Sequence, residues 1–164
     1  MMLMYRRLMN MAEEIERKFL VDTSWRPQRA GTHIAQGYLC REPERTVRVR
    51  IRGDKGYLTI KGKNKGISRL EYEYEIPLKD AEELLQLCER PLVEKTRYLE
   101  DWEGFCWEID VFAGENAGLV VAEIELPSPK TAFARPSWLS DEVSDDARYY
   151  NSNLIKMPYS QWKK

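Results

Sequence analysis

Glu14-Ile15-Glu16-Arg17-Lys18 places ionic side chains at every second position near the start of this 164-residue chain. Successive side chains of a β-strand point to opposite faces of its sheet, so Glu14, Glu16 and Lys18 are expected to share one face. The same alternation returns later in the chain, in Arg48-Val49-Arg50, Tyr57-Leu58-Thr59-Ile60-Lys61, Glu71-Tyr72-Glu73-Tyr74-Glu75, Glu108-Ile109-Asp110 and Glu123-Ile124-Glu125. The sequence therefore predicts a β-sheet with one face that carries both acids and bases.

Composition fits one ordinary domain, with 43% hydrophobic residues and a high charged content of 32%. The net charge is only −1, so the chain is not a basic nucleic-acid binder and we expect no nucleic-acid partner. Cys40, Cys88 and Cys106 lie far apart, without the spacing of a zinc site or a disulfide framework. This usage of cysteine favours a reducing, cytoplasmic location.

The methionine-rich start of the chain is too short and too interrupted for a signal peptide or a membrane span. We therefore predict a disordered leader over residues 1–12, one domain over 13–158 and a tail over 159–164. No membrane partner is expected, and the sequence leaves a monomer and a homodimer both open.

Strands are expected wherever alternating or apolar runs are bounded by turn residues. The predicted strands cover residues 14–21, 33–40, 45–52, 56–62, 69–76, 94–101, 105–112 and 118–126. Gly53-Asp54-Lys55-Gly56 is typical of a hairpin connection between two of them.

Helices are predicted in three places. Asp80 is a candidate N-cap for a helix with an apolar stripe that includes Leu84 and Leu85, and Pro91 ends this helix. A short helix is expected over residues 129–134. A terminal helix is expected to start at Ser144-Asp145-Asp146 and to run through Ile155.

Alternation alone is also typical of an open antiparallel sheet with one solvated face. Two features favour closure instead: the ionic positions contain few Ser or Thr residues, and the opposite face is crowded with apolar residues that helices and loops must cover. These apolar residues are Ile15, Val49, Ile51, Leu58, Ile60, Tyr72, Tyr74, Ile109, Val111 and Ile124. Because closure removes exposed strand edges, we predict a mainly β, α+β fold. It is an eight-stranded antiparallel closed β-barrel with helices packed outside and a C-terminal helix near one end.

Ionic side chains inside such a barrel would need counter-charges. The candidate inward bases are Lys18, Arg48, Arg50, Lys61, Lys63, Lys95 and Arg97. The candidate inward acids are Glu14, Glu16, Glu71, Glu73, Glu75, Glu108, Asp110, Glu123 and Glu125. Acids outnumber bases, and a bound polyphosphate adds more negative charge, which is costly to bury. Mg²⁺ or Mn²⁺ resolves this cost, because these ions bind carboxylate and phosphate oxygens together.

Taken in order, these segments resemble the CYTH superfamily, the triphosphate tunnel metalloenzymes. Glu14-Ile15-Glu16-Arg17-Lys18 matches its ExExK signature, and the later segments are similar in order and spacing to short bacterial members. Those later segments include Leu58-Thr59-Ile60-Lys61, Ser68-Arg69-Leu70-Glu71-Tyr72-Glu73, Glu94-Lys95-Thr96-Arg97-Tyr98 and Ala122-Glu123-Ile124-Glu125. Asp146-Ala147-Arg148-Tyr149-Tyr150-Asn151-Ser152-Asn153 resembles their C-terminal end, so the resemblance covers roughly residues 13–158.

The resemblance implies hydrolysis of a triphosphate with Mg²⁺ or Mn²⁺, and inorganic tripolyphosphate is the substrate typical of short bacterial members. The metal ligands that it implies are Glu14, Glu16, Asp110, Glu123 and Glu125. The substrate-binding residues are Lys18, Arg48, Arg50, Lys61 and Arg97, for which salt bridges to neighbouring acids are the competing role. The catalytic residues are Glu16, Glu73, Lys95 and Glu125. Glu108 is a further candidate to orient metal-bound water, and Lys63 is a candidate for the rim only.

Two other functions stay open at this point. One is a related activity of the same superfamily, either a class IV adenylate cyclase or a thiamine triphosphatase. The other is a polyphosphate- or nucleotide-binding barrel without catalysis. The sequence shows no nucleobase or thiamine pocket that would favour the first.

Overall fold

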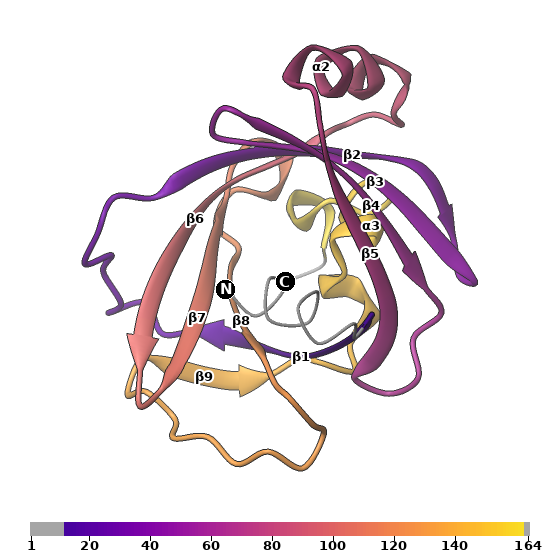
Figure 1. Cartoon of the computed structure of the whole chain (residues 1–164). Helices are drawn as coiled ribbons and strands as arrows, with labels where there is room; N and C mark the ends of the chain where they lie inside the picture. The colour runs from indigo at the N-terminus through magenta and orange to yellow at the C-terminus, as the bar shows by residue number, and fades with distance from the viewer. Residues whose placement is uncertain (1–11, 163–164) are drawn as a thin grey trace.

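Nine antiparallel β-strands make up about half of residues 12–162, the part of the chain that this computed structural model describes (Figure 1). The strands are β1 (Glu13–Val21), β2 (Thr32–Glu42), β3 (Arg45–Arg52), β4 (Lys55–Gly62), β5 (Ser68–Ile76), β6 (Val93–Trp102), β7 (Phe105–Phe112), β8 (Val120–Glu125) and β9 (Leu139–Glu142). The predicted hairpin between β3 and β4 is confirmed, and Gly53 turns it with a φ of 60°, which favours glycine. The predicted leader lies, except for Ala12, outside the described residues.

The sheet curves until its ends meet. Its strand order is β5-β4-β3-β2-β6-β7-β8-β1-β9, and β1 also pairs with β5. That pairing joins Glu13–Ile15 to residues 68–70 only, so the sheet is a curved ring with a short seam (Figure 1). Beyond the seam, β9 pairs with the last part of β1. The prediction of eight strands therefore missed β9, whose four residues carry no alternation of ionic and apolar groups.

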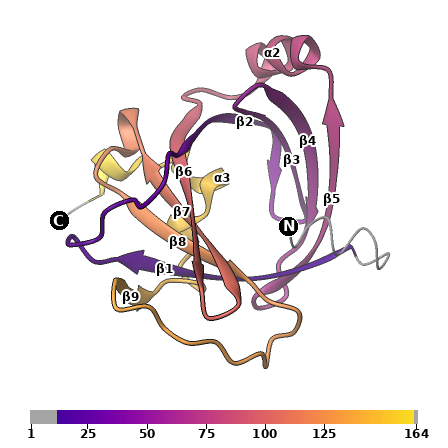
Figure 2. The ribbon, with the colours of Figure 1, turned by 60° about the vertical axis from the view of Figure 1, so that its left-hand side comes forward.

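The helices differ from their predictions in position and length. α2 (Leu78–Leu87) lies outside the ring and packs on β2, β3 and β4, as expected of an outer helix (Figure 2). Its N-cap is Pro77, so Asp80 stands in the first turn and not at the cap. No helix forms over residues 129–134. None of the helices in the described part of the chain has the length and apolar character needed to cross a bilayer.

The C-terminal segment is more broken than predicted. The 3₁₀ turn η2 (Ala147–Tyr149) is capped by Asp146, whose side chain accepts a hydrogen bond from the Arg148 backbone N–H. Extended backbone at Tyr150 separates this turn from α3 (Asn151–Leu154), which is only four residues long. A further 3₁₀ turn, η3 (Tyr159–Gln161), lies in the predicted tail.

One end of the ring interior is apolar and filled. Leu154 and Ile155 pack there on Tyr38, Val93 and Phe112, which belong to three different strands. The register places Tyr38 opposite Arg48 and Phe112 opposite Lys95, so the apolar cluster and the ionic residues share the inner face of the sheet. The C-terminal segment therefore closes this end and leaves the ionic part of the interior beside it.

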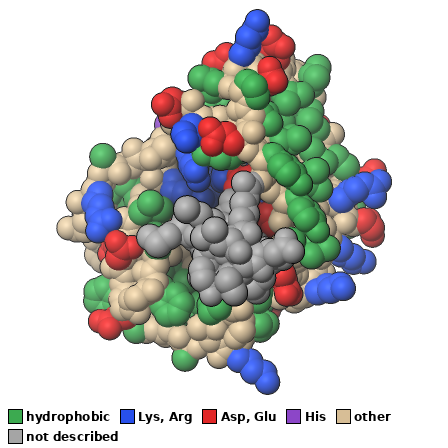
Figure 3. Space-filling view, in the orientation of Figure 1, with side chains coloured by type: hydrophobic (Ala, Val, Ile, Leu, Met, Phe, Trp, Pro, Cys, Tyr) green, Lys and Arg blue, Asp and Glu red, His purple; other side chains and the backbone are tan. Residues whose placement is uncertain are grey.

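The outer face of the sheet is covered only in part. Ile15, Ile109 and Ile124 are buried under the segment that contains Phe133 and Trp138, as predicted. The prediction that helices and loops cover this face is wrong for Tyr72 and Tyr74, which are 45% and 53% exposed. Ile60 and Leu70 are also exposed, and hydrophobic side chains gather on the β5 side of the molecule (Figure 3). The reason is that α2 is only ten residues long and packs mainly on β3 and β4.

Candidate functional site

The inner face of β1 carries Glu14, Glu16 and Lys18, as the alternation predicts. Glu14 and Lys18 are 6% and 7% exposed. In the β1–β8 ladder, Glu16 lies opposite Glu125 and Lys18 lies opposite Glu123. Directly opposed residues of an antiparallel pair point to the same face, so all of these side chains face the interior.

A polar cavity, open to solvent, occupies the ionic part of the interior. Its lining residues are Glu16, Lys18, Tyr38, Thr46, Arg48, Lys61, Arg69, Lys95, Arg97, Glu123, Tyr150, Asn151 and Ser152. A second hollow shares Glu16, Lys18, Arg69 and Tyr150 with it and adds Glu14. Basic residues exceed acidic ones in the lining of the larger cavity, so the cavity suits an anion.

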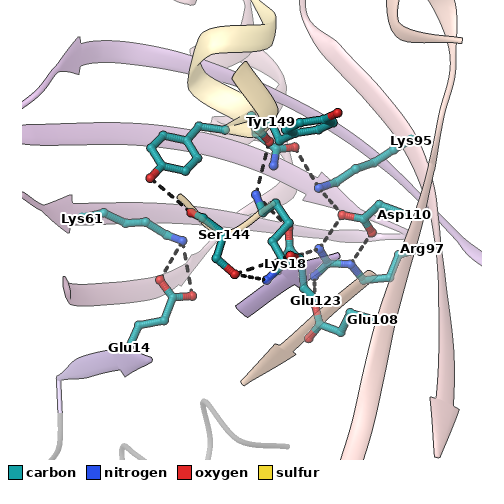
Figure 4. Close-up of polar contacts among 12 residues, drawn as sticks. Glu14, Lys18, Lys61, Lys95, Arg97, Glu108, Asp110, Glu123, Ser144 and Tyr149 are labelled. Carbon is teal, nitrogen blue, oxygen red and sulfur yellow. Dashed lines mark hydrogen bonds and ion pairs between the residues drawn. The ribbon is translucent and has the colours of Figure 1, made fainter. Parts of the chain in front are cut away.

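Asp110 is the centre of one ionic cluster (Figure 4). Lys95 Nζ donates to Asp110 Oδ2 at 2.6 Å, and Arg97 Nε donates to Asp110 Oδ1 at 2.7 Å. Burial opposes ionisation of Asp110, but Arg97 and Lys95 outweigh it and lower its pKa. Burial lowers the pKa of Lys95 to about 8, despite the nearby charge of Asp110. Both oxygens of this carboxylate are therefore satisfied by the protein itself.

Glu73 on β5 holds two arginines of β3, across the intervening strand β4. Arg50 Nη2 donates to Glu73 Oε1 at 2.8 Å, and Arg48 Nη2 lies 3.8 Å from the same oxygen. Thr59 also donates to Glu73 Oε1 and accepts from Arg48. Burial, with Arg48 close by, lowers the pKa of Arg50 to about 10. This cluster fixes Arg48 at the cavity wall with Arg50 behind it.

Ionic contacts also cross the seam between β1 and β5. Lys61 Nζ lies 3.0 Å from Glu14 Oε2 and 3.0 Å from Glu71 Oε2. Arg69 Nε lies 3.4 Å from the same Glu14 oxygen. These contacts join β1, β4 and β5 where the backbone pairing is short.

Glu16 and Glu123 form a different kind of arrangement, because two carboxylates lie side by side. Burial, then the charges of Glu123 and Glu14, raises the pKa of Glu16 well above its usual value. Burial also opposes ionisation of Glu123, but Lys18, and after it Arg97 and Lys95, bring its pKa well below the usual value. When Glu16 and Glu123 are both ionised, the pair therefore carries one more negative charge than the neighbouring bases stabilise.

The structure brings most of the predicted residues together. Glu16, Lys18, Arg48, Lys61, Lys95, Arg97 and Glu123 line the cavity, and Glu14 lines the adjoining hollow. Arg50, Glu73 and Asp110 are buried just behind the wall. Glu125 faces the interior opposite Glu16 but lines neither hollow. Glu108 contacts Arg97 at a half-exposed position near the rim.

Two predicted inward residues are not inside. The Glu75 side chain is 57% exposed and pairs with Lys55 at the solvent-facing end of β5. Lys63 is exposed beside Glu44, close to the turn that follows β4. The prediction for Glu75 was wrong because alternation gives the face of a residue but not its distance from the end of the ring, whereas the exposed position of Lys63 agrees with its assignment to the rim only.

Other residues in the cavity wall or directly behind it were missed. Arg69, Glu71 and Glu73 are alternate residues of β5, so the alternation already indicated that Arg69 faces the interior. Thr59 likewise alternates with Tyr57 and Lys61. Asn151 and Gln36, which contact each other, carry no such signal, because one lies in the irregular C-terminal segment and the other is uncharged.

The acidic pair fits a divalent cation that is shared with a ligand. In residues 12–162, no three acidic, histidine or cysteine side chains converge closely enough to hold a metal ion alone. Mg²⁺ is usually bound by one or two carboxylates together with substrate phosphates and water. The Glu16–Glu123 pair beside a base-lined cavity has this donor set.

A ring of antiparallel strands around an ionic interior defines the class of the protein: a mainly β protein with a charged cavity inside a curved sheet. The CYTH domain model matches residues 12–153, which is most of the chain. The chain therefore belongs to the CYTH domain family, and the resemblance seen in the sequence is confirmed.

Similar proteins cover nearly the whole chain. An inorganic triphosphatase of Acetivibrio thermocellus is 52% identical over 155 residues, which are 93% of this chain and 99% of that protein. One from Nitrosomonas europaea is 39% identical over 146 residues, 86% of this chain and 95% of that protein. A crystal structure of an inorganic triphosphatase aligns with a TM-score of 0.64 at 36% identity, covering 87% of this chain and 93% of the other. A Pyrococcus horikoshii protein, with a TM-score of 0.53 at 22% identity over 71% of this chain and 79% of its own, shares the fold.

Proposed function

We propose that this protein is a metal-dependent triphosphatase that hydrolyses inorganic tripolyphosphate to diphosphate and phosphate within the ring. The observation that carries the proposal is the solvent-open cavity in which bases surround the Glu16–Glu123 pair. The names of the similar proteins support the same reaction. The short β1–β5 seam, reinforced by Lys61 and Glu14, supports a ring that acts as a closed tunnel.

Substrate binding is assigned to the basic wall. Lys18, Lys61 and Arg97 are held in place by acidic partners and line the cavity from three different strands. Charge-assisted hydrogen bonds to phosphate oxygens are stronger than neutral ones, and Arg offers a fixed fork of donors. Arg48, positioned by Glu73 and Thr59, adds a further donor, and Arg50 supports it from behind.

Metal binding is assigned to Glu16 and Glu123, which lie on the paired strands β1 and β8, while Glu14 stays with its bases Lys61 and Arg69. When bound, Mg²⁺ or Mn²⁺ neutralises phosphate charge and lowers the pKa of a coordinated water. Glu125 lies opposite Glu16, and we assign its carboxylate to accept the proton that the attacking water gives up.

Stabilisation of the leaving diphosphate is assigned to one lysine on β6 and one on β4. Lys95 and Lys61 each present a charged nitrogen to the cavity, where it offsets the charge that develops on the leaving oxygen. We give Asp110 a role other than metal binding. Its oxygens already accept from Lys95 and Arg97, so it orients these two bases toward the substrate.

The test is phosphate release from tripolyphosphate, ATP and thiamine triphosphate, each measured with Mg²⁺, with Mn²⁺ and with chelator. The proposal expects tripolyphosphate to be the best substrate and chelator to abolish release. Cyclic AMP as the product from ATP would identify a cyclase instead. Tight, metal-dependent binding of tripolyphosphate without phosphate release would identify a binding protein.

A further inference from the structure

Asn151 lines the cavity but belongs to the C-terminal segment and not to the sheet. It is the first residue of α3, and its neighbours Tyr150 and Ser152 line the cavity as well. α3 is anchored by Leu154, which is fully buried against the inner apolar cluster. Asn151 is therefore held at a fixed position on the cavity wall.

The orientation of the Asn151 amide follows from its two neighbours. Lys95 Nζ lies 3.0 Å from Asn151 Oδ1, and a lysine ammonium group can only donate, so this atom must be the carbonyl oxygen. Gln36 Nε2 donates to the same oxygen at 3.3 Å. Gln36 is fully buried, which fixes its amide in place. Oδ1 is thus occupied twice, and the Nδ2 group is directed elsewhere.

No hydrogen bond from Asn151 Nδ2 is found within residues 12–162, although the residue lines the cavity. An amide donor held at the wall of a base-lined cavity suits an anionic oxygen. It adds a hydrogen bond without adding charge next to Lys95, whose ammonium group already lies near Arg97. Donors that are preorganised in this way lose little free energy on ordering when the ligand binds.

We propose that Asn151 is a further substrate-binding residue, which donates from Nδ2 to a phosphate oxygen while its Oδ1 positions Lys95. The inference rests on the proposed triphosphatase function. It adds the C-terminal segment to a site otherwise built from strands. It also gives Gln36 a role, as a positioning residue that acts through Asn151.

The test compares Asn151→Ala and Asn151→Asp with the wild-type protein in steady-state hydrolysis of tripolyphosphate. Loss of one hydrogen bond to a charged group costs about 1.5–3 kcal/mol, so Asn151→Ala should raise KM about 10- to 100-fold. Asn151→Asp has nearly the same shape but presents a carboxylate oxygen to phosphate, and it should raise KM at least as much. Gln36→Leu should raise KM by about fivefold, because Lys95 still holds Oδ1.

Asn153→Ala is the matched control. Asn153 lies in the same short helix, but its Nδ2 donates to the Ala147 backbone oxygen and it does not line the cavity. Its KM should stay within twofold of wild type. A thermal melt of each variant checks folding, since a purely structural role would lower the melting temperature and the active fraction without changing KM.

The inference is overturned if both Asn151 variants keep a KM within twofold of wild type. Calorimetric titration of tripolyphosphate with Mg²⁺ gives a second readout that does not need turnover, and the Asn151 variants should bind more weakly by the same factor. Failure of the proposed function looks different: the wild-type protein itself would release no phosphate. The calorimetric comparison would then still confirm or refute the binding role of Asn151.

Discussion

Glu16 on β1 and Asp110 on β7 both face the interior of the ring, yet their surroundings differ in charge. Asp110 accepts from Lys95 and Arg97, and its pKa is lowered. Glu16 lies beside two other carboxylates, and its pKa is raised. Burial opposes ionisation of both groups, although Glu16 is only partly buried, so the neighbouring charges make the difference. The comparison indicates that Asp110 is a structural ion-pair partner, whereas Glu16 belongs to a site that gains from an added cation.

Asp110→Asn should have the largest effect on stability. The change leaves Lys95 and Arg97 buried without their common carboxylate, and breaking a buried pair in this way costs about 3–5 kcal/mol. Urea unfolding at pH 7 measures the free energy of unfolding of variant and wild type. A loss below about 1 kcal/mol would contradict the role given to Asp110 and remove the contrast with Glu16.

Glu16→Gln should have the opposite profile, with lost activity and intact folding. We expect kcat/KM with Mg²⁺ to fall at least about 100-fold, because the metal loses a ligand. A group with a raised pKa in the folded state destabilises the protein as the pH rises through that pKa. Glutamine does not ionise, so the melting temperature of the variant should match or exceed that of wild type, increasingly so at higher pH.

Glu75→Gln is the control for this experiment, because it is the same substitution at an exposed site on the solvent-facing end of β5. Activity within twofold and stability within about 0.5 kcal/mol of wild type are expected there. If Glu16→Gln kept full metal-dependent activity, Glu16 would be removed from the site.

Lys61→Ala tests whether a base of the seam, which contacts both Glu14 and Glu71, also binds substrate. Loss of a charged donor to phosphate should raise KM about tenfold. Steady-state kinetics on tripolyphosphate measures this change, and Lys63→Ala, at an exposed site on the same segment, is its control. An unchanged KM would mean that Lys61 serves only the ion pairs of the seam.

The smallest of these effects is expected for Lys95, and it is a pH dependence of kcat/KM. Its pKa is lowered to about 8, and the protonated form binds phosphate, so binding weakens as the pH rises through this value. We expect kcat/KM to fall about fourfold between pH 7 and pH 8.5, since kcat/KM reports ionisation of the free enzyme. In Lys95→Arg the residual activity should lose this decline, because arginine stays protonated. A decline that persists unchanged would assign it to another group.

The sequence predicted which side chains face the site better than it predicted where the interior of the ring ends. Strict alternation at Glu14, Glu16 and Lys18 determines their face, because side chains of a strand alternate whatever the rest of the fold does. Alternation carries no information on depth, which is why Glu75 was misplaced. Its pairing with Lys55 depends on where β4 and β5 reach solvent, and this is set by the whole ring.

The place of Asn151 in the cavity wall was beyond prediction for a different reason. Asn151 reaches the cavity only because Leu154 and Ile155 enter one end of the ring, and this packing joins residues far apart in the sequence. β9 was missed similarly, since its four residues pair with β1 through backbone groups that any sequence supplies. Tertiary contacts, not local pattern, place both segments.

The most direct test of the central claim is a crystal structure with tripolyphosphate and Mn²⁺, with anomalous scattering used to locate the metal. The account predicts an anomalous peak in contact with Glu16 and Glu123, and a polyphosphate chain beside Lys18, Lys61 and Arg97. Manganese and tripolyphosphate found only outside the ring, with Glu16 and Glu123 contacting neither, would contradict it.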